Sequence, residues 1–133
     1  ALGRKTEKKK CEELHPFVIT LEDASVTTSG DAFQAIEIEG IRYSHIVDPR
    51  TGLGVVGSTG VTVIAPDATT ADALATTLSV LGPQAGYEFV EQTAGCSARF
   101  VWHEDGKVRV RTSSQWSSQT SYSSQKKIKT GRE

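Results

Sequence analysis

Two short stretches of this sequence hold side chains that can do acid–base and metal chemistry. The first, HIVDPRTG, runs from His45 to Gly52 and holds an imidazole, a carboxylate, a guanidinium and a hydroxyl in eight residues. An imidazole can accept a proton from a hydroxyl group near neutral pH. The second holds Asp72 and Thr76 four residues apart, a spacing that puts both on one face of a helix. Carboxylate and hydroxyl oxygens are the hard ligands that suit Mg²⁺.

Each stretch also has a purely structural interpretation. Pro49 fixes φ for a turn, Asp48 can cap that turn through its side chain, and Gly52 accepts a positive φ. A lone histidine such as His45 is more often structural than catalytic. Asp72 in the first turn of a helix is favoured by the helix dipole. From spacing alone, the structural interpretation is favoured for both stretches.

Two glycine-containing segments carry weaker signals. TTSGD, residues 27–31, groups polar side chains around Gly30, where a glycine lets the backbone approach a ligand closely. GLGVVG, residues 52–57, matches the G-x-G-x-x-G pattern of dinucleotide-binding proteins. That pattern works only where it opens a helix, whereas a strand pattern follows here. We therefore interpret residues 52–57 as a flexible glycine loop.

Short strands are expected on both sides of the first stretch. PFVITL, residues 16–21, predicts a short strand. AIEIEGIRYSHIV, residues 35–47, alternates apolar and polar residues and predicts two strands joined by a tight turn at Glu39–Gly40. VTVIAP, residues 61–66, is almost wholly apolar and predicts a strand buried on both faces.

A helical pattern begins at residue 67 and stops at Gly82–Pro83. Its apolar residues at helical spacing are Ala71, Leu74, Leu78 and Leu81. Pro83 can also open a second helix through residues 84–92. Residues 97–111 then predict a hairpin, because Asp105–Gly106 is a type I′ turn signal between alternating strands. The predicted order β-β-β-β-α-α-β-β indicates an α+β fold with a mostly antiparallel sheet and two consecutive helices.

The net charge of −1 hides an uneven distribution. Residues 1–10 and 112–133 are basic, whereas residues 11–111 hold six Lys or Arg against 14 Asp or Glu, a formal charge of −8. Nucleic-acid binding needs a basic surface, so we predict no nucleic-acid partner. The 133 residues allow one domain at most.

The folded domain is expected to span residues 14–111, with a flexible basic segment at 1–13. Residues 112–133 contain seven serines and almost no aliphatic side chains. A segment of this composition buries too little apolar surface to offset the conformational entropy that it loses on ordering. We therefore expect disorder there, unless Trp116 and Tyr122 dock onto a surface.

No apolar run approaches the roughly 20 residues needed to span a bilayer. The N-terminal sequence does not read as a signal peptide, because no apolar core follows its charges. Cys11 and Cys96 either pair in an oxidising compartment or remain free, and free thiols are favoured.

Three stretches together resemble the C-terminal half of the ApbE-type FAD:protein FMN transferases. They are SVTTSGDAF, GIRYSHIVDPRTG and VTVIAPDATTADALATTLSVLGP, in the order and spacing of that family. The most characteristic parts are H-I-x-D-P-x-T-G and A-D-A-L-A-T. The resemblance covers residues 18–103 and implies part of an ApbE-like, T-fold-like domain. No stretch resembles the N-terminal half of the family.

The resemblance implies Mg²⁺-dependent transfer of FMN from FAD to a Thr or Ser hydroxyl of an acceptor protein, with release of AMP. The alternatives are FAD hydrolysis and a non-catalytic flavin-binding or interaction module. The implied partners are FAD, an acceptor redox protein, and either the missing N-terminal half or a dimer partner. The implied location is the periplasm or cell envelope, as a lipoprotein.

The resemblance also assigns residues. It implies that Asp72 and Thr76 ligate magnesium and that His45 is the base for the acceptor hydroxyl. The residues expected against the flavin nucleotide are Ser29, Gly30, His45, Ile46 and Asp48. The sequence departs from the family at Ala75, where some relatives carry a second acidic residue, so other oxygens are needed at the metal.

Overall fold

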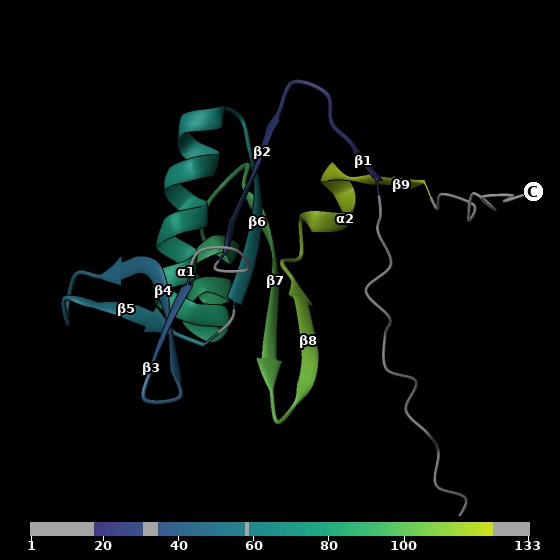
Figure 1. Cartoon of the computed structure of the whole chain (residues 1–133). Helices are drawn as coiled ribbons and strands as arrows, with labels where there is room; N and C mark the ends of the chain where they lie inside the picture. The colour runs from purple at the N-terminus through teal and green to yellow at the C-terminus, as the bar shows by residue number, and fades with distance from the viewer. Residues whose placement is uncertain (1–17, 31–34, 58, 124–133) are drawn as a thin grey trace, which may run out of the picture.

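The computed structural model describes residues 18–30, 35–57 and 59–123 (Figure 1). Its body is an antiparallel sheet in the order β2 (Ser25–Gly30), β6 (Thr59–Ala65), β7 (Ser97–Glu104) and β8 (Lys107–Thr112). Helix α1 (Ala68–Glu91) packs against β2, β6 and β7 and covers one face of this sheet. The predicted α+β class with mostly antiparallel strands is confirmed.

Two smaller sheets flank this body. One has the order β3 (Ala35–Ile38), β4 (Ile41–Asp48) and β5 (Leu53–Val56). The other pairs β1 (Val18–Thr20) with β9 (Ser121–Ser123), which follows the short helix α2 (Trp116–Gln119).

The core forms between α1 and the inward face of the four-stranded sheet. In β6, Val61, Val63 and Ala65 alternate toward the helix and are completely or almost completely buried. The helix contributes small side chains such as Ala71 and Ala75, which let it lie close to the strands. Burial of this apolar surface is the main term that stabilises the arrangement. On the opposite face of β6, Ile64 is buried but Thr62 is only half-buried, so the strand is covered on both sides only in part.

The helical region is one element with a break, whereas two consecutive helices were predicted. Gly82 leaves helical geometry with φ 78° and ψ 174°. Pro83 follows, and its missing N–H is tolerated at the first position of a helical turn. Helical geometry resumes directly, so no connecting loop separates the two parts. Asp67 caps the start, because its carboxylate accepts a hydrogen bond from the Thr70 N–H at 2.8 Å.

Two segments that were not predicted to be strands are strands. Residues 25–30, which include most of the TTSGD cluster, form edge strand β2. Residues 53–56, within the predicted glycine loop, form β5 and pair with β4. The two predicted hairpin turns are confirmed, because Glu39–Gly40 and Asp105–Gly106 all have positive φ.

Residues 113–123, which follow β8, include α2 and β9, although we expected disorder over residues 112–133. Residues 124–133 lie outside the described residues. Trp116 is 1% exposed, and α2 contacts β7. The Glu91 carboxylate accepts hydrogen bonds from the Ser114 N–H at 2.6 Å and from its hydroxyl at 2.7 Å. Trp116 therefore docks onto the rest of the fold, which was the stated alternative to disorder. The expected flexibility of residues 1–13 lies outside the described residues.

Within the described ranges, no helix has the length and apolar character needed to cross a membrane. Cys96 is a free, buried thiol. Burial, followed by the nearby charge of Asp67, raises the pKa of Cys96. Cys11 lies outside the described residues.

Candidate functional site

Strand β4 presents His45 to solvent. Ser44 and Ile46 are buried, whereas His45 and Val47 are exposed. Side chains alternate between the faces of a strand, so those of His45 and Ile46 point in opposite directions. A ligand beside the His45 ring would therefore meet Ile46 through its backbone rather than its side chain.

The turn after β4 is held by Asp48. Its Oδ1 accepts hydrogen bonds from the Arg50 N–H and Nε, both at 2.9 Å, and its Oδ2 accepts from Nη2 at 2.7 Å. The Asp48 carbonyl oxygen accepts from the Gly52 N–H at 2.8 Å, and Gly52 has φ 70°. These bonds from Arg50, with its side chain as the larger cause, hold the pKa of Asp48 below its ordinary value. The structural interpretation of DPRTG as a turn is therefore confirmed.

The two predicted magnesium ligands lie on the first half of α1. Asp72 and Thr76 are both exposed and one helical turn apart. Ala71 and Ala75, beside them in sequence, are buried against the sheet. The pair supplies two hard oxygens, which fit Mg²⁺. The described ranges contain no cluster of three or more His, Cys, Asp or Glu side chains suited to a metal, so further oxygens would have to complete six-fold coordination.

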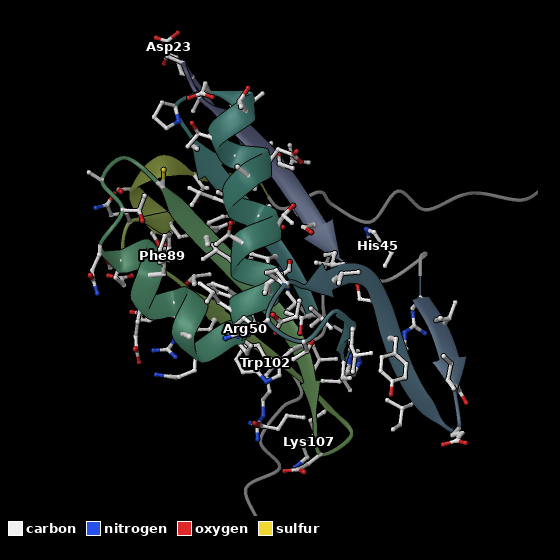
Figure 2. The ribbon with its side chains drawn as sticks, turned by 90° about the vertical axis from the view of Figure 1, so that its left-hand side faces the viewer. Asp23, His45, Arg50, Phe89, Trp102 and Lys107 are labelled. Carbon is white, nitrogen blue, oxygen red and sulfur yellow. The ribbon has the colours of Figure 1, made fainter. Side chains whose placement is uncertain are left out.

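Ser29 and Gly30 form the C-terminal end of β2. Gly30 pairs with Gly60, and a Cβ added at Gly30 would lie 3.3 Å from the Gly60 Cα. Since α1 contacts both β2 and β4, the three elements that carry the predicted site are neighbours. Figure 2 shows His45 on the side of the molecule toward which β2 runs, away from Asp23, which lies two residues before that strand.

A cavity of about 290 Å³ adjoins His45. Its lining residues are Ala35, Ile36, Tyr43, Ser44 and His45. Most of these side chains are apolar, and His45 supplies a titratable group. The cavity therefore gives a ligand a place beside the imidazole.

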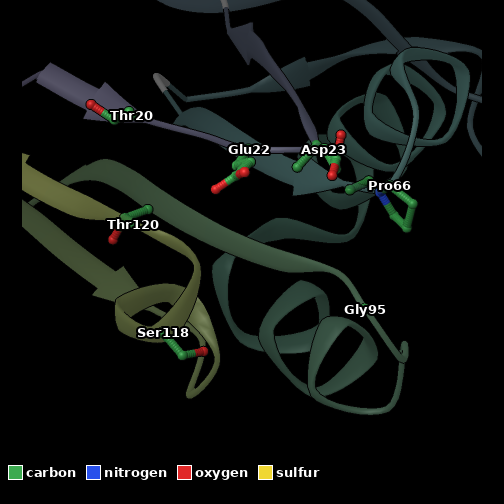
Figure 3. A pocket seen from close by; sticks show the side chains of 9 residues that line it. Thr20, Glu22, Asp23, Pro66, Gly95, Ser118 and Thr120 are labelled. Atoms are coloured by element: carbon green, nitrogen blue, oxygen red, sulfur yellow. The ribbon is translucent and has the colours of Figure 1, made fainter.

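A larger pocket of about 530 Å³ was not predicted from the sequence (Figure 3). It lies at the start of β2, where Ser25 pairs with Ala65. At about 3.3 Å per residue, that end is roughly 17 Å from Gly30. Its residues come from four separated segments: Thr20, Glu22, Asp23, Ala24, Ala65, Pro66, Gly95, Ser118 and Thr120. No local sequence pattern could have joined them.

Comparison with known proteins assigns this chain to one family. The family model described as the ApbE family matches residues 4–100. An FAD:protein FMN transferase of Treponema pallidum is 38% identical over 95 residues, which are 71% of this chain and 26% of the relative. The corresponding protein of Escherichia coli K12 is 33% identical over 119 residues, 89% of this chain and 33% of the relative. The chain thus spans about a quarter to a third of these relatives' length.

Solved structures share the fold. The apo form of the flavinyl transferase ApbE from Pseudomonas stutzeri matches with a TM-score of 0.66 and 30% identity, over 79% of this chain and 36% of that one. The ApbE protein of Thermotoga maritima matches with a TM-score of 0.60 and 35% identity, over 71% and 30%. The chain therefore belongs to the ApbE family, whose matched curated members are FAD:protein FMN transferases.

Proposed function

We propose that this chain carries the His45 and Asp72–Thr76 part of a Mg²⁺-dependent FMN transferase. The enzyme would move FMN from FAD to a Thr or Ser hydroxyl of an acceptor protein and release AMP. One observation carries the proposal. In a chain of this family, neighbouring elements present an exposed histidine beside a cavity and an exposed Asp–Thr pair one helical turn apart.

The proposed reaction is a phosphoryl-type transfer. The acceptor hydroxyl oxygen attacks the phosphorus of the FMN half of FAD, and the bond from that phosphorus to the AMP oxygen breaks. His45 accepts the hydroxyl proton, which requires hydrogen-bond reach between the imidazole and the hydroxyl. Bound Mg²⁺ would neutralise charge that develops on the diphosphate. Asp72 and Thr76 would hold that ion through one carboxylate and one hydroxyl oxygen.

The other predicted residues would position the nucleotide. Gly30, paired with Gly60, leaves space for close approach of a ligand at the end of β2, and Ser29 offers a hydroxyl there. Asp48 is engaged by Arg50, so we assign it to the turn that follows His45 rather than to proton transfer. Ile46 would contribute its backbone, because the residue is buried and its side chain points away from the His45 side.

A second candidate function is binding of a flavin nucleotide without transfer. This candidate is favoured because the chain covers only 26% and 33% of the lengths of the two curated relatives. The remaining contacts would then come from residues outside this sequence, equivalent to the rest of the family fold, or from a second copy. Hydrolysis of FAD is the third possibility, with water in place of the acceptor hydroxyl. We further propose a periplasmic or cell-envelope location, which rests on the family resemblance alone.

A titration of FAD with and without Mg²⁺, followed by flavin fluorescence, tests the metal assignment. Binding that needs Mg²⁺ and weakens at least tenfold in Asp72→Ala is the expected result. Ala73→Ser is a matched control, because it changes an exposed neighbour on the same helix. Identical Mg²⁺ dependence in Asp72→Ala and wild type would refute the assignment of Asp72 as a ligand.

A further inference from the structure

An irregularity in the pairing of β4 with β5, which we treat as a β-bulge, contains His45. β4 pairs with β5 at Tyr43–Val56 and again at Val47–Gly54, and the register shifts between these two pairs. Three residues of β4, 44–46, therefore lie opposite one residue of β5, Val55. Bulges of this kind redirect a side chain and occur preferentially next to active sites. The conformation of the bulge therefore sets the backbone from which the His45 side chain projects.

The Ser44 side chain fixes the bulge from inside. Ser44 is 8% exposed, and its hydroxyl oxygen accepts a hydrogen bond from the Ile46 N–H at 3.1 Å. In the registers described for β3–β4 and β4–β5, Ile46 has no paired residue. The hydroxyl therefore satisfies a buried N–H that would otherwise cost free energy. This bond spans His45, so it restrains the backbone on both sides of the imidazole.

Gly54 fixes the bulge from outside. A Cβ added at Gly54 would overlap the Ser44 carbonyl oxygen and lie 3.2 Å from the Tyr43 Cβ. Only glycine lets β5 approach this part of β4 without displacing it. The Ser44 hydroxyl and the Gly54 backbone thus hold the same segment from two sides.

We infer that Ser44 is a positioning residue, which sets the direction of the His45 imidazole through the Ile46 N–H. The role of His45 as a base rests on the proposed function, whereas the effect of Ser44 on its geometry does not. Proton transfer needs heavy atoms about 2.6–3.2 Å apart. Even a small displacement of the bulge would therefore slow transfer more than it weakens nucleotide binding.

The first test compares wild type, Ser44→Ala and Ser44→Thr by NMR in the full 133-residue chain. In Ser44→Ala, the Ile46 amide should exchange with solvent about tenfold faster, and the His45 ring signals should move. Ser44→Thr keeps a hydroxyl and should restore both. Ser79→Ala is the matched control, since Ser79 is 3% exposed and donates only a local hydrogen bond to the Ala75 carbonyl oxygen at 2.9 Å.

Unchanged Ile46 exchange and unchanged His45 signals in a folded Ser44→Ala would overturn the inference. If Ser44→Ala does not fold, the exchange of the Ile46 amide in the wild-type chain and in Ser44→Thr tests the inference instead. A protected Ile46 amide in both supports the bond, and exchange at the unprotected rate in wild type overturns it.

The second test measures FMN transfer in a single turnover together with the FAD dissociation constant. Ser44→Ala should lower the transfer rate at least tenfold and change the dissociation constant less than twofold. Equal losses in both would assign Ser44 to nucleotide binding and overturn the positioning role. A wild-type chain that neither binds FAD nor transfers FMN would refute the proposed function, while the NMR readouts would still decide the role of Ser44.

Discussion

At the residue scale, β4 uses three consecutive positions for different tasks. Ser44 and Ile46 are buried and joined by a hydrogen bond, whereas His45 between them is exposed beside a cavity. A group that exchanges a proton with an outside molecule needs that exposure, and its supports need burial to stay fixed. The exposed His45 therefore lies between two buried neighbours in sequence that are bonded to each other.

Replacement of His45, the proposed base, should affect the rate of FMN transfer much more than the binding of FAD. His45→Ala should slow FMN transfer by about 10²–10⁴-fold, with little change in the FAD dissociation constant, because the nucleotide keeps its other contacts. Single-turnover transfer and flavin fluorescence measure the two quantities. His103→Ala, at an exposed histidine on β7, is the control. Comparable losses in rate and affinity would make His45 a binding residue.

Acid should weaken the attachment of the C-terminal segment through Glu91. Hydrogen bonds from the Ser114 N–H and then its hydroxyl lower the pKa of Glu91 below its ordinary value of 4.5. Between that value and the lower folded pKa, the unfolded chain binds more protons than the folded one. The contribution is therefore present above pH 4.5 and is lost as pH falls through the folded pKa.

Chemical denaturation at pH 7 and at acid pH measures this contribution. Glu91→Gln and Ser114→Ala should each reduce the loss of unfolding free energy between the two conditions. Ser118→Ala is the control, because its hydroxyl donates to the Gln115 carbonyl oxygen instead of a carboxylate. An acid dependence that stays the same in Glu91→Gln would contradict the assignment.

At the element scale, the break in α1 depends on one glycine. Gly82 has φ 78° and ψ 174°, a region that is almost closed to residues with a Cβ. Gly82→Ala should therefore lower the free energy of unfolding by about 1–3 kcal/mol, measured by chemical denaturation. Gly60→Ala is the matched control, since its Cβ would meet no atom closer than 4.0 Å. Equal effects of the two substitutions would show that strain at Gly82 is not the cause.

The elements that the sequence predicted well are those with a single dominant local signal. The hairpin turns at Glu39–Gly40 and Asp105–Gly106 follow from turn chemistry, and the buried strand β6 follows from its apolar, β-branched run. β2 and β5 were missed for different reasons. β2 is a polar edge strand, and the glycines of residues 52–57 suggested a loop, although Gly54 serves close packing between strands.

The candidate site could be predicted only in part. Motif and resemblance pointed to His45, Asp72 and Thr76, and the structure shows all three exposed on neighbouring elements. Their roles stay predictions. The bulge around His45 could not be predicted, because it depends on the pairing of β4 with β5 and on the missing side chain at Gly54.

At the scale of the whole molecule, the sheet β3–β4–β5 exposes apolar side chains in register. Ile36 pairs with Tyr43, and Tyr43 pairs with Val56, so the three share one face. Ile36 is 63% exposed and Val56 61%. Exposed apolar patches mark interaction sites or cause self-association. This chain should therefore self-associate as its concentration rises.

Sedimentation at increasing concentration tests this expectation. Ile36→Thr combined with Val56→Thr should shift association to higher concentration without a large change in stability. Val110→Thr, on the four-stranded sheet, is the control. A mass that stays monomeric for the wild-type chain at all concentrations would contradict the expectation.

The pairing of the first and last described strands has a mechanical consequence. β1 and β9 are antiparallel, with Val18 opposite Ser123 and Thr20 opposite Ser121. Val18 and Ser123 therefore lie together at one end of the ribbon. Tension applied through these two residues would break the hydrogen bonds one after another from that end, instead of loading all of them at once. This ribbon would thus yield first under load, before force reaches the four-stranded sheet.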